Sequence, residues 1–170
     1  GFSVIATANT RDKGVNEMSA ALKRRFNIVV LPTPASLETE IDIVKTRVEQ
    51  LSGGMELNAS LPESDVVEKV CTIFRELRNG ETCDKSQKLK TTTGVLSTAE
   101  AISLLCGSMA LAGSFGNGKV SDEDLAAGLA GAVIKEEDKD VTAWKEYLEN
   151  VMKKRGSKWS GLYNACRELL

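Results

Sequence analysis

The sequence predicts a mainly helical protein that begins with a short α/β segment. Two runs rich in β-branched and apolar residues, 1–7 and 26–31, flank one amphipathic stretch. This order is typical of two parallel strands joined by a crossover helix. From Ser36 onwards, apolar residues recur only at helical spacing, between capping residues and glycines. We therefore expect two strands of a parallel sheet, followed by an all-α region.

The first 34 residues are expected to be part of a larger sheet. The run Gly1–Thr7 resembles a strand that is buried on both faces, and a loop and a short helix follow it. The second run, Phe26–Leu31, ends at Pro32. Two strands alone cannot bury such apolar faces. We therefore expect the chain to start in the middle of a domain, with unpaired strand edges that favour self-association.

The rest of the chain is expected to form six helices. Serines precede several of the apolar stripes, and Ser97 and Glu100 have the spacing of a capping box. The helix that follows Ser97 is apolar nearly all round and should be central. The polar stretch 79–95 should be a loop. The expected helices cover about 36–52, 62–79, 98–112, 121–133, 140–154 and 159–169.

The composition excludes several classes of function. The 170 residues have a net charge of −2, so the chain has no overall attraction for nucleic acid or anionic membranes. No window approaches 18 consecutive apolar residues, which predicts no spanning helix. There is no histidine, which excludes Ser–His or Cys–His catalysis and histidine zinc sites.

The four cysteines are expected to be reduced thiols. Cys71, Cys83, Cys106 and Cys166 are too widely spaced for a metal cage, and a chain of this length needs no disulfides. Cys83 lies in a polar stretch and should be exposed, whereas the other three lie in apolar stripes. We expect a cytoplasmic protein without a bound metal.

Three short motifs are candidates for phosphate chemistry. Gly113–Val120 nearly matches a phosphate-binding loop, but no strand precedes it, so a turn between helices is the better interpretation. Asn9 follows the first strand, at the edge of a sheet where ligands bind. Arg24 and Arg25 end the first helix, where cations favour the helix dipole but can also reach a γ-phosphate across a subunit boundary.

The order of these features resembles the second half of an AAA+ ATPase module, in its MoxR-like, dynein-related branch. Phe2–Asn9 is similar to the sensor-1 strand, and Met18–Phe26 is similar to the helix that ends in the arginine finger. Ser121–Leu125 resembles the opening of a lid helix in that branch. By this resemblance, 1–34 is the end of the α/β core and 35–54 a linker helix. Residues 55–136 would form the helical lid and 137–170 a C-terminal extension.

The resemblance implies a protein that binds ATP and Mg²⁺ between the subunits of a ring, which in that branch is a hexamer. It implies that Asn9 orients the attacking water as sensor 1. Arg25 would be the arginine finger, and Arg24 is the alternative candidate for this role. It also implies remodelling of a partner protein, often one with a von Willebrand factor A domain.

The sequence departs from the family pattern in two ways. Ser97–Glu100 stands where the sensor-2 arginine is expected, and it contains no arginine. Neither a strand-framed Walker A nor a Walker B motif is present. We therefore expect this chain alone to bind no ATP or Mg²⁺ and to be inactive as an ATPase.

Two other functions remain as alternatives. The chain could be an intact, non-enzymatic helical module for protein interaction, because its helices are amphipathic. Nucleic-acid binding through Lys85, Lys88 and Lys90 is disfavoured, because no basic stripe is interleaved with aromatic residues.

Overall fold

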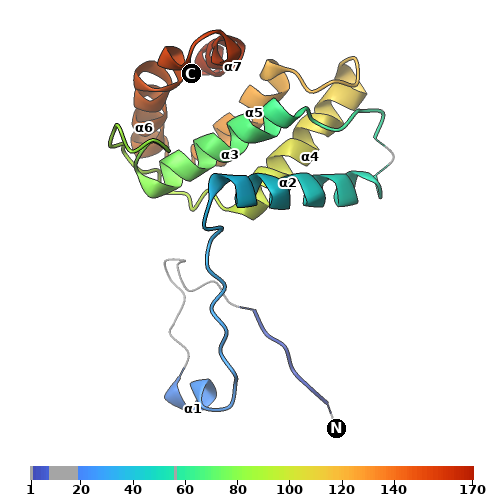
Figure 1. Cartoon of the computed structure of the whole chain (residues 1–170), viewed down its shortest axis with the longest axis vertical. Coiled ribbons are helices and arrows are strands. Elements are labelled where there is room, and N and C mark those ends of the chain that lie inside the picture. The colour runs from blue at the N-terminus through green and yellow to red at the C-terminus, as the bar shows by residue number, and fades with distance from the viewer. Residues whose placement is uncertain (1, 8–18, 56) are drawn as a thin grey trace. The chain divides into compact units, whose positions relative to one another are not determined.

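The computed structural model describes residues 2–7, 19–55 and 57–170, in two units, Gly1–Thr33 and Pro34–Leu170. The described part of the first unit contains the short helix α1 (Ala20–Lys23). The second unit is helical (Figure 1). Its elements are α2 (Leu37–Ser52), α3 (Ser64–Asn79), α4 (Thr98–Phe115), α5 (Asp122–Val133), α6 (Glu137–Asn150), the 3-10 helix η1 (Met152–Arg155) and α7 (Ser157–Glu168).

Side-chain caps begin three of these helices, as the sequence predicts. The Ser36 hydroxyl accepts a hydrogen bond from the Thr39 N–H at the start of α2. Ser97 and Glu100 form a reciprocal capping box on α4, and Ser121 and Asp124 form one on α5. Each cap satisfies N–H groups that have no partner inside the helix.

Helix α4 is central to the second unit, and α2, α3 and α5 pack against it (Figure 1). Its apolar core residues include Leu105 and Met109, which are almost fully buried. Gly128 allows the close packing of α5, because a Cβ atom there would lie 2.9 Å from Leu104 Cγ. Helix α4 is long and apolar enough to cross a membrane, but the core helix of a soluble protein passes the same test.

The two predicted strands are wrong for the described residues. Residues 2–7 and 26–31 are extended but not in a sheet. Their apolar side chains are exposed, with Ile5 94% and Leu31 87% accessible. A strand needs neighbouring strands to satisfy its backbone and cover its faces, and the described residues supply none. The mainly helical prediction is confirmed, whereas the parallel sheet is not observed.

Several helix boundaries differ from the predictions. The helix expected at 140–154 is divided into α6 and η1, since the regular α-helix ends at Asn150. Helix α4 continues to Phe115, and its last turns expose Leu111 and Phe115, so it is not buried all round. The expected loop 79–95 contains a small antiparallel hairpin, with a bridge between Glu81 and Lys88.

The predicted turn at 113–118 is confirmed only in its second half, because residues 113–115 form the end of α4 and the bend begins at Gly116. Gly118 has a φ of 82°, which an L-residue rarely adopts, and a Cβ atom on it would lie 2.8 Å from the Asn58 carbonyl oxygen. Its own carbonyl accepts a hydrogen bond from the Ser60 N–H at 2.8 Å. These glycines therefore allow the segment before α3 to pack closely on the turn.

A buried carboxylate connects α6 to the loop before α4. Asp140 is fully buried and accepts hydrogen bonds from the backbone N–H groups of Thr93, Lys135 and Glu136, at 2.8 to 2.9 Å. The Thr93 hydroxyl also donates to it, at 2.7 Å. Burial raises the pKa of Asp140, but these hydrogen bonds outweigh it and lower the pKa to about 2.

We predict that Asp140→Asn lowers the unfolding free energy by about 2 kcal/mol at neutral pH, because it loses charge-assisted hydrogen bonds. Because the folded-state pKa is depressed, this stabilisation is present above the unfolded pKa of about 4 and is lost as pH falls towards 2. The difference in unfolding free energy between wild type and variant, measured in urea, should therefore narrow as the pH falls from about 5 to about 2.5.

The matched control is Asp138→Asn, in the same helical turn but on an exposed residue. It should cost less than about 1 kcal/mol, the usual size of a helix-dipole effect. Equal losses for the two variants would show that the Asp140 hydrogen bonds contribute nothing.

Candidate functional site

The arginine pair predicted from the sequence lies at the end of α1. Ser19 caps this helix by accepting a hydrogen bond from the Leu22 N–H at 3.3 Å. Arg24 is its C-cap residue, and the Arg25 N–H donates to the Leu22 carbonyl at 2.9 Å. Both arginines are exposed. Asn9, the predicted sensor 1, lies outside the described residues, so the structure does not bring it together with Arg24 or Arg25.

A second cluster, which the sequence analysis missed, lies in the helical unit around Glu40. This carboxylate on α2 is fully buried. Arg78 on α3 donates to both of its oxygens from one nitrogen, at 2.7 and 3.0 Å. Arg75 donates to it at 3.3 Å, and the Thr98 hydroxyl on α4 donates at 2.9 Å. One carboxylate therefore joins three helices. We call these four residues the Glu40 cluster.

Arg75 also fixes the segment that leads into α2. Its guanidinium donates to the carbonyl oxygens of Pro34 and Ala35, at 3.1 and 2.7 Å. Its side chain keeps 19% of its surface exposed, whereas that of Arg78 keeps 8%. Two guanidinium groups share one carboxylate, so the cluster has a net charge of +1, and Arg75 is its more accessible cation.

The cluster extends to the base of α4. The second nitrogen of Arg78 donates to the Leu96 carbonyl at 2.8 Å. Leu96 is fully buried and has a φ of 47°, in the left-handed region that branched side chains rarely adopt. Such a conformation persists only where surrounding contacts hold it. The next residue, Ser97, caps α4.

A similar cluster surrounds Glu76 on α3, which is also fully buried. It accepts hydrogen bonds from Arg155 in η1, from the Tyr147 hydroxyl on α6 at 2.7 Å, and from the Cys83 N–H at 2.8 Å. Burial, and then the charge of Glu76, raises the pKa of Tyr147 well above its ordinary value. The phenol therefore remains protonated as a donor.

The thiols beside the two clusters are not activated for covalent chemistry. Burial, followed by the charge of Glu40, raises the pKa of the Cys71 thiol to about 12, so it is not a nucleophile at neutral pH. Cys83 lies in an exposed loop, but partial burial of its thiol, followed by the charge of Glu76, raises its pKa to about 11. No group of metal-ligating side chains occurs among the described residues. What the Glu40 cluster can do is fix helices and present a cation.

One sequence signal could have revealed the Glu40 cluster. Glu40 lies among the apolar residues that face the core from α2, between Leu37 and Val44. A carboxylate on a buried helix face requires a cation or several donors. Arg75 and Arg78, three residues apart on the next helix, share one face and could supply them.

We predict that Glu40→Gln lowers the unfolding free energy by about 3–5 kcal/mol, because it leaves two guanidinium groups in a buried site without their counter-charge. The measurement is urea unfolding of the 170-residue chain. The matched control is Glu49→Gln, an exposed position on the same helix, which should change stability by less than about 0.5 kcal/mol. A Glu40 variant as stable as this control would contradict a stabilising role.

The chain matches known proteins over nearly its whole length. The model of the YehL-like AAA+ ATPase C-terminal domain matches residues 38–169. The protein YehL of Escherichia coli K12 is 34% identical over 171 residues, covering 99% of this chain and 46% of YehL. The chain thus spans about half the length of this curated relative. No solved structure matches it. The chain belongs to the YehL-like family of AAA+ ATPase C-terminal domains.

Proposed function

We propose that this chain is the C-terminal part of an AAA+ ATPase of the MoxR-like branch, which hydrolyses Mg-ATP in a ring. One observation carries the proposal. The family match begins at residue 38, and an exposed arginine pair, Arg24 and Arg25, precedes it at the end of α1. An exposed guanidinium outside the helical unit is suited to reach the nucleotide of a neighbouring subunit.

In this proposal Arg25 is the arginine finger and Asn9 is sensor 1. ATP and Mg²⁺ bind to the α/β core of the longer protein, and the ring is a hexamer. Its output is the remodelling or activation of a partner protein, with a von Willebrand factor A-domain protein as the first candidate. The reduced thiols favour a cytoplasmic location.

Arg25→Ala in the full-length ATPase should lower the rate of ATP hydrolysis by about 10³–10⁵, the range for an arginine finger. Arg24→Ala should have a much smaller effect. Arg47→Ala on α2 is the matched control, because Arg47 is exposed and its guanidinium donates a hydrogen bond to Gln50 in the neighbouring turn of the same helix. The measurement is steady-state phosphate release at saturating ATP.

Mixed rings test whether the finger acts in trans. Arg25→Ala subunits should regain activity when mixed with subunits whose phosphate-binding lysine is replaced, because each supplies what the other lacks. A large loss with Arg24→Ala alone would move the role to Arg24. No loss with either variant would contradict an arginine finger at this helix. Absence of ATP hydrolysis by the full-length protein would favour the non-enzymatic interaction module.

We also propose that Arg75 takes the role of the sensor-2 arginine, which is absent from Ser97–Glu100, and contacts the bound ATP. It is the more accessible arginine beside the base of α4, and its charge is not fully neutralised by Glu40. In the full-length ATPase, Arg75→Ala should raise KM for ATP about tenfold, and Arg75→Lys should restore much of the loss. An unchanged KM in a folded Arg75→Ala protein would refute this role.

A further inference from the structure

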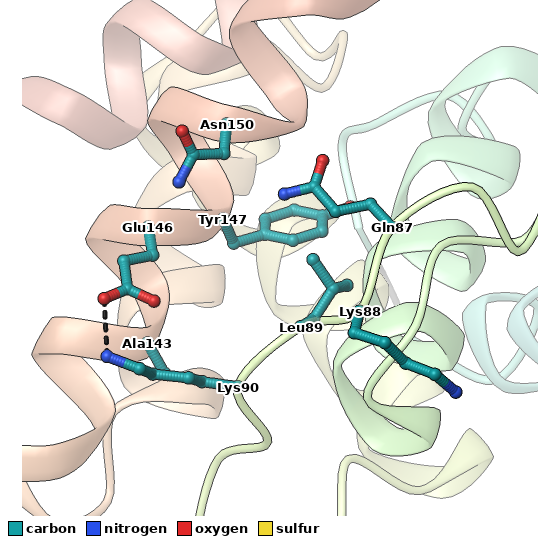
Figure 2. Close-up of a pocket in the computed structure, with 8 residues that line it drawn as sticks. All are labelled: Gln87, Lys88, Leu89, Lys90, Ala143, Glu146, Tyr147 and Asn150. Atoms are coloured by element: carbon teal, nitrogen blue, oxygen red, sulfur yellow. Dashed lines mark hydrogen bonds and ion pairs between the residues drawn. The ribbon is translucent and has the colours of Figure 1, made fainter.

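The geometry points to a binding site for an extended, uncharged peptide segment of a partner protein, in the pocket between the hairpin residues 87–90 and α6. The pocket has a volume of about 350 Å³. Figure 2 shows the hairpin segment on one side and α6 on the other, with the Tyr147 ring between them. The inference does not rest on ATP hydrolysis.

The hairpin presents a free backbone edge. Its hydrogen bonds run from the Thr82 N–H to the Gln87 carbonyl at 3.0 Å, and from the Leu89 N–H to the Gly80 carbonyl at 2.8 Å. Glu81 and Lys88 are therefore a non-hydrogen-bonded pair, so the N–H and C=O groups of Lys88 point away from the opposite strand. An extended peptide can pair with such an edge by strand addition.

The floor of the pocket is apolar. The Tyr147 ring is only 2% exposed, and its hydroxyl is already engaged by Glu76. Ala143 is buried beside it, and Leu89 on the hairpin is half-buried. In Figure 2 Leu89 lies next to the ring. Leu89, packed over these buried residues, therefore supplies the accessible apolar contact for one aliphatic side chain of a peptide whose backbone lies along the hairpin.

The charges around the pocket are already paired. Lys90 on the hairpin forms an ion pair of 2.6 Å with Glu146 on α6, drawn as a dashed line in Figure 2. Lys88 pairs with Glu81 at 2.7 Å, on the side of the hairpin away from α6. An acidic peptide or a phosphate group would have to compete with these carboxylates. The charge pattern therefore favours a neutral occupant.

The polar groups that are free at the pocket are amides. Gln87 on the hairpin and Asn150 on α6 both line it, and their side chains make no hydrogen bond with the described residues. Figure 2 shows both amide groups above the Tyr147 ring. An amide side chain both donates and accepts, which matches the N–H and C=O of a peptide bond. Backbone edge, aliphatic floor and two amides thus select the same ligand class.

The test is an NMR titration of the ¹⁵N-labelled 170-residue chain. The probe is a capped heptapeptide in which threonine alternates with valine and leucine. We expect its addition to shift the amide signals of Lys88, Lys90 and the pocket face of α6, with saturation. The same peptide with a central aspartate should bind about tenfold more weakly, because it finds no free cation. Inorganic phosphate should cause no shifts there.

Two variants at one position separate backbone pairing from side-chain effects. Lys88→Pro removes the outward N–H but leaves both hairpin hydrogen bonds. It should weaken binding of the heptapeptide about tenfold or more. Lys88→Ala removes the ion pair with Glu81 but keeps the N–H, and it should bind within about twofold of wild type. The shift dispersion of each variant confirms that it is folded.

Three outcomes would overturn the inference. These are no shifts at the pocket at millimolar heptapeptide, shifts confined to another surface, and unchanged binding by a folded Lys88→Pro variant. Preferential binding of the aspartate peptide or of phosphate would also overturn it, since either would identify an anion site.

Discussion

The burial of Glu40 between two arginines is the interaction on which the helical unit depends. A carboxylate without water must be matched by charge and hydrogen bonds, and here the matching groups come from α3 and α4. The same arginines hold the Pro34, Ala35 and Leu96 carbonyls. A single buried charge therefore fixes how the chain enters the unit, how α2 packs on α3, and where α4 begins.

The same kind of interaction recurs at two other buried carboxylates, Glu76 and Asp140. Glu76 joins α3 to α6 and η1, and Asp140 joins α6 to the loop before α4. Each buried carboxylate connects elements that are far apart in sequence. Apolar packing tolerates small sliding of helices, whereas a hydrogen-bonded carboxylate has one geometry that satisfies all of its partners. These clusters thus fix the relative positions of helices whose other contacts in the core are apolar.

The sequence predicted the helices well because caps and apolar periodicity are local signals. Ser36, Ser97 and Ser121 each begin a helix, and the burial of Cys71, Cys106 and Cys166 follows from their stripes. The strand predictions failed because a strand forms only when neighbouring strands pair with its backbone, and local sequence does not show whether they are present. The Glu40 cluster was missed because its members lie 35 and 38 residues apart. The break between α6 and η1 likewise depends on packing.

The attachment of Arg75 to Pro34 and Ala35 has a mechanical consequence. Helix α2 has 16 residues, so it is a rod of about 24 Å. The Glu40 cluster clamps this rod at its first turn to α3 and α4, and Arg75 holds residues 34 and 35 to the same helices. A rotation of about 10° about the first turn of α2 would carry the far end of a 24 Å rod through about 4 Å. Because the three helices are joined at that end, such a rotation would move them together.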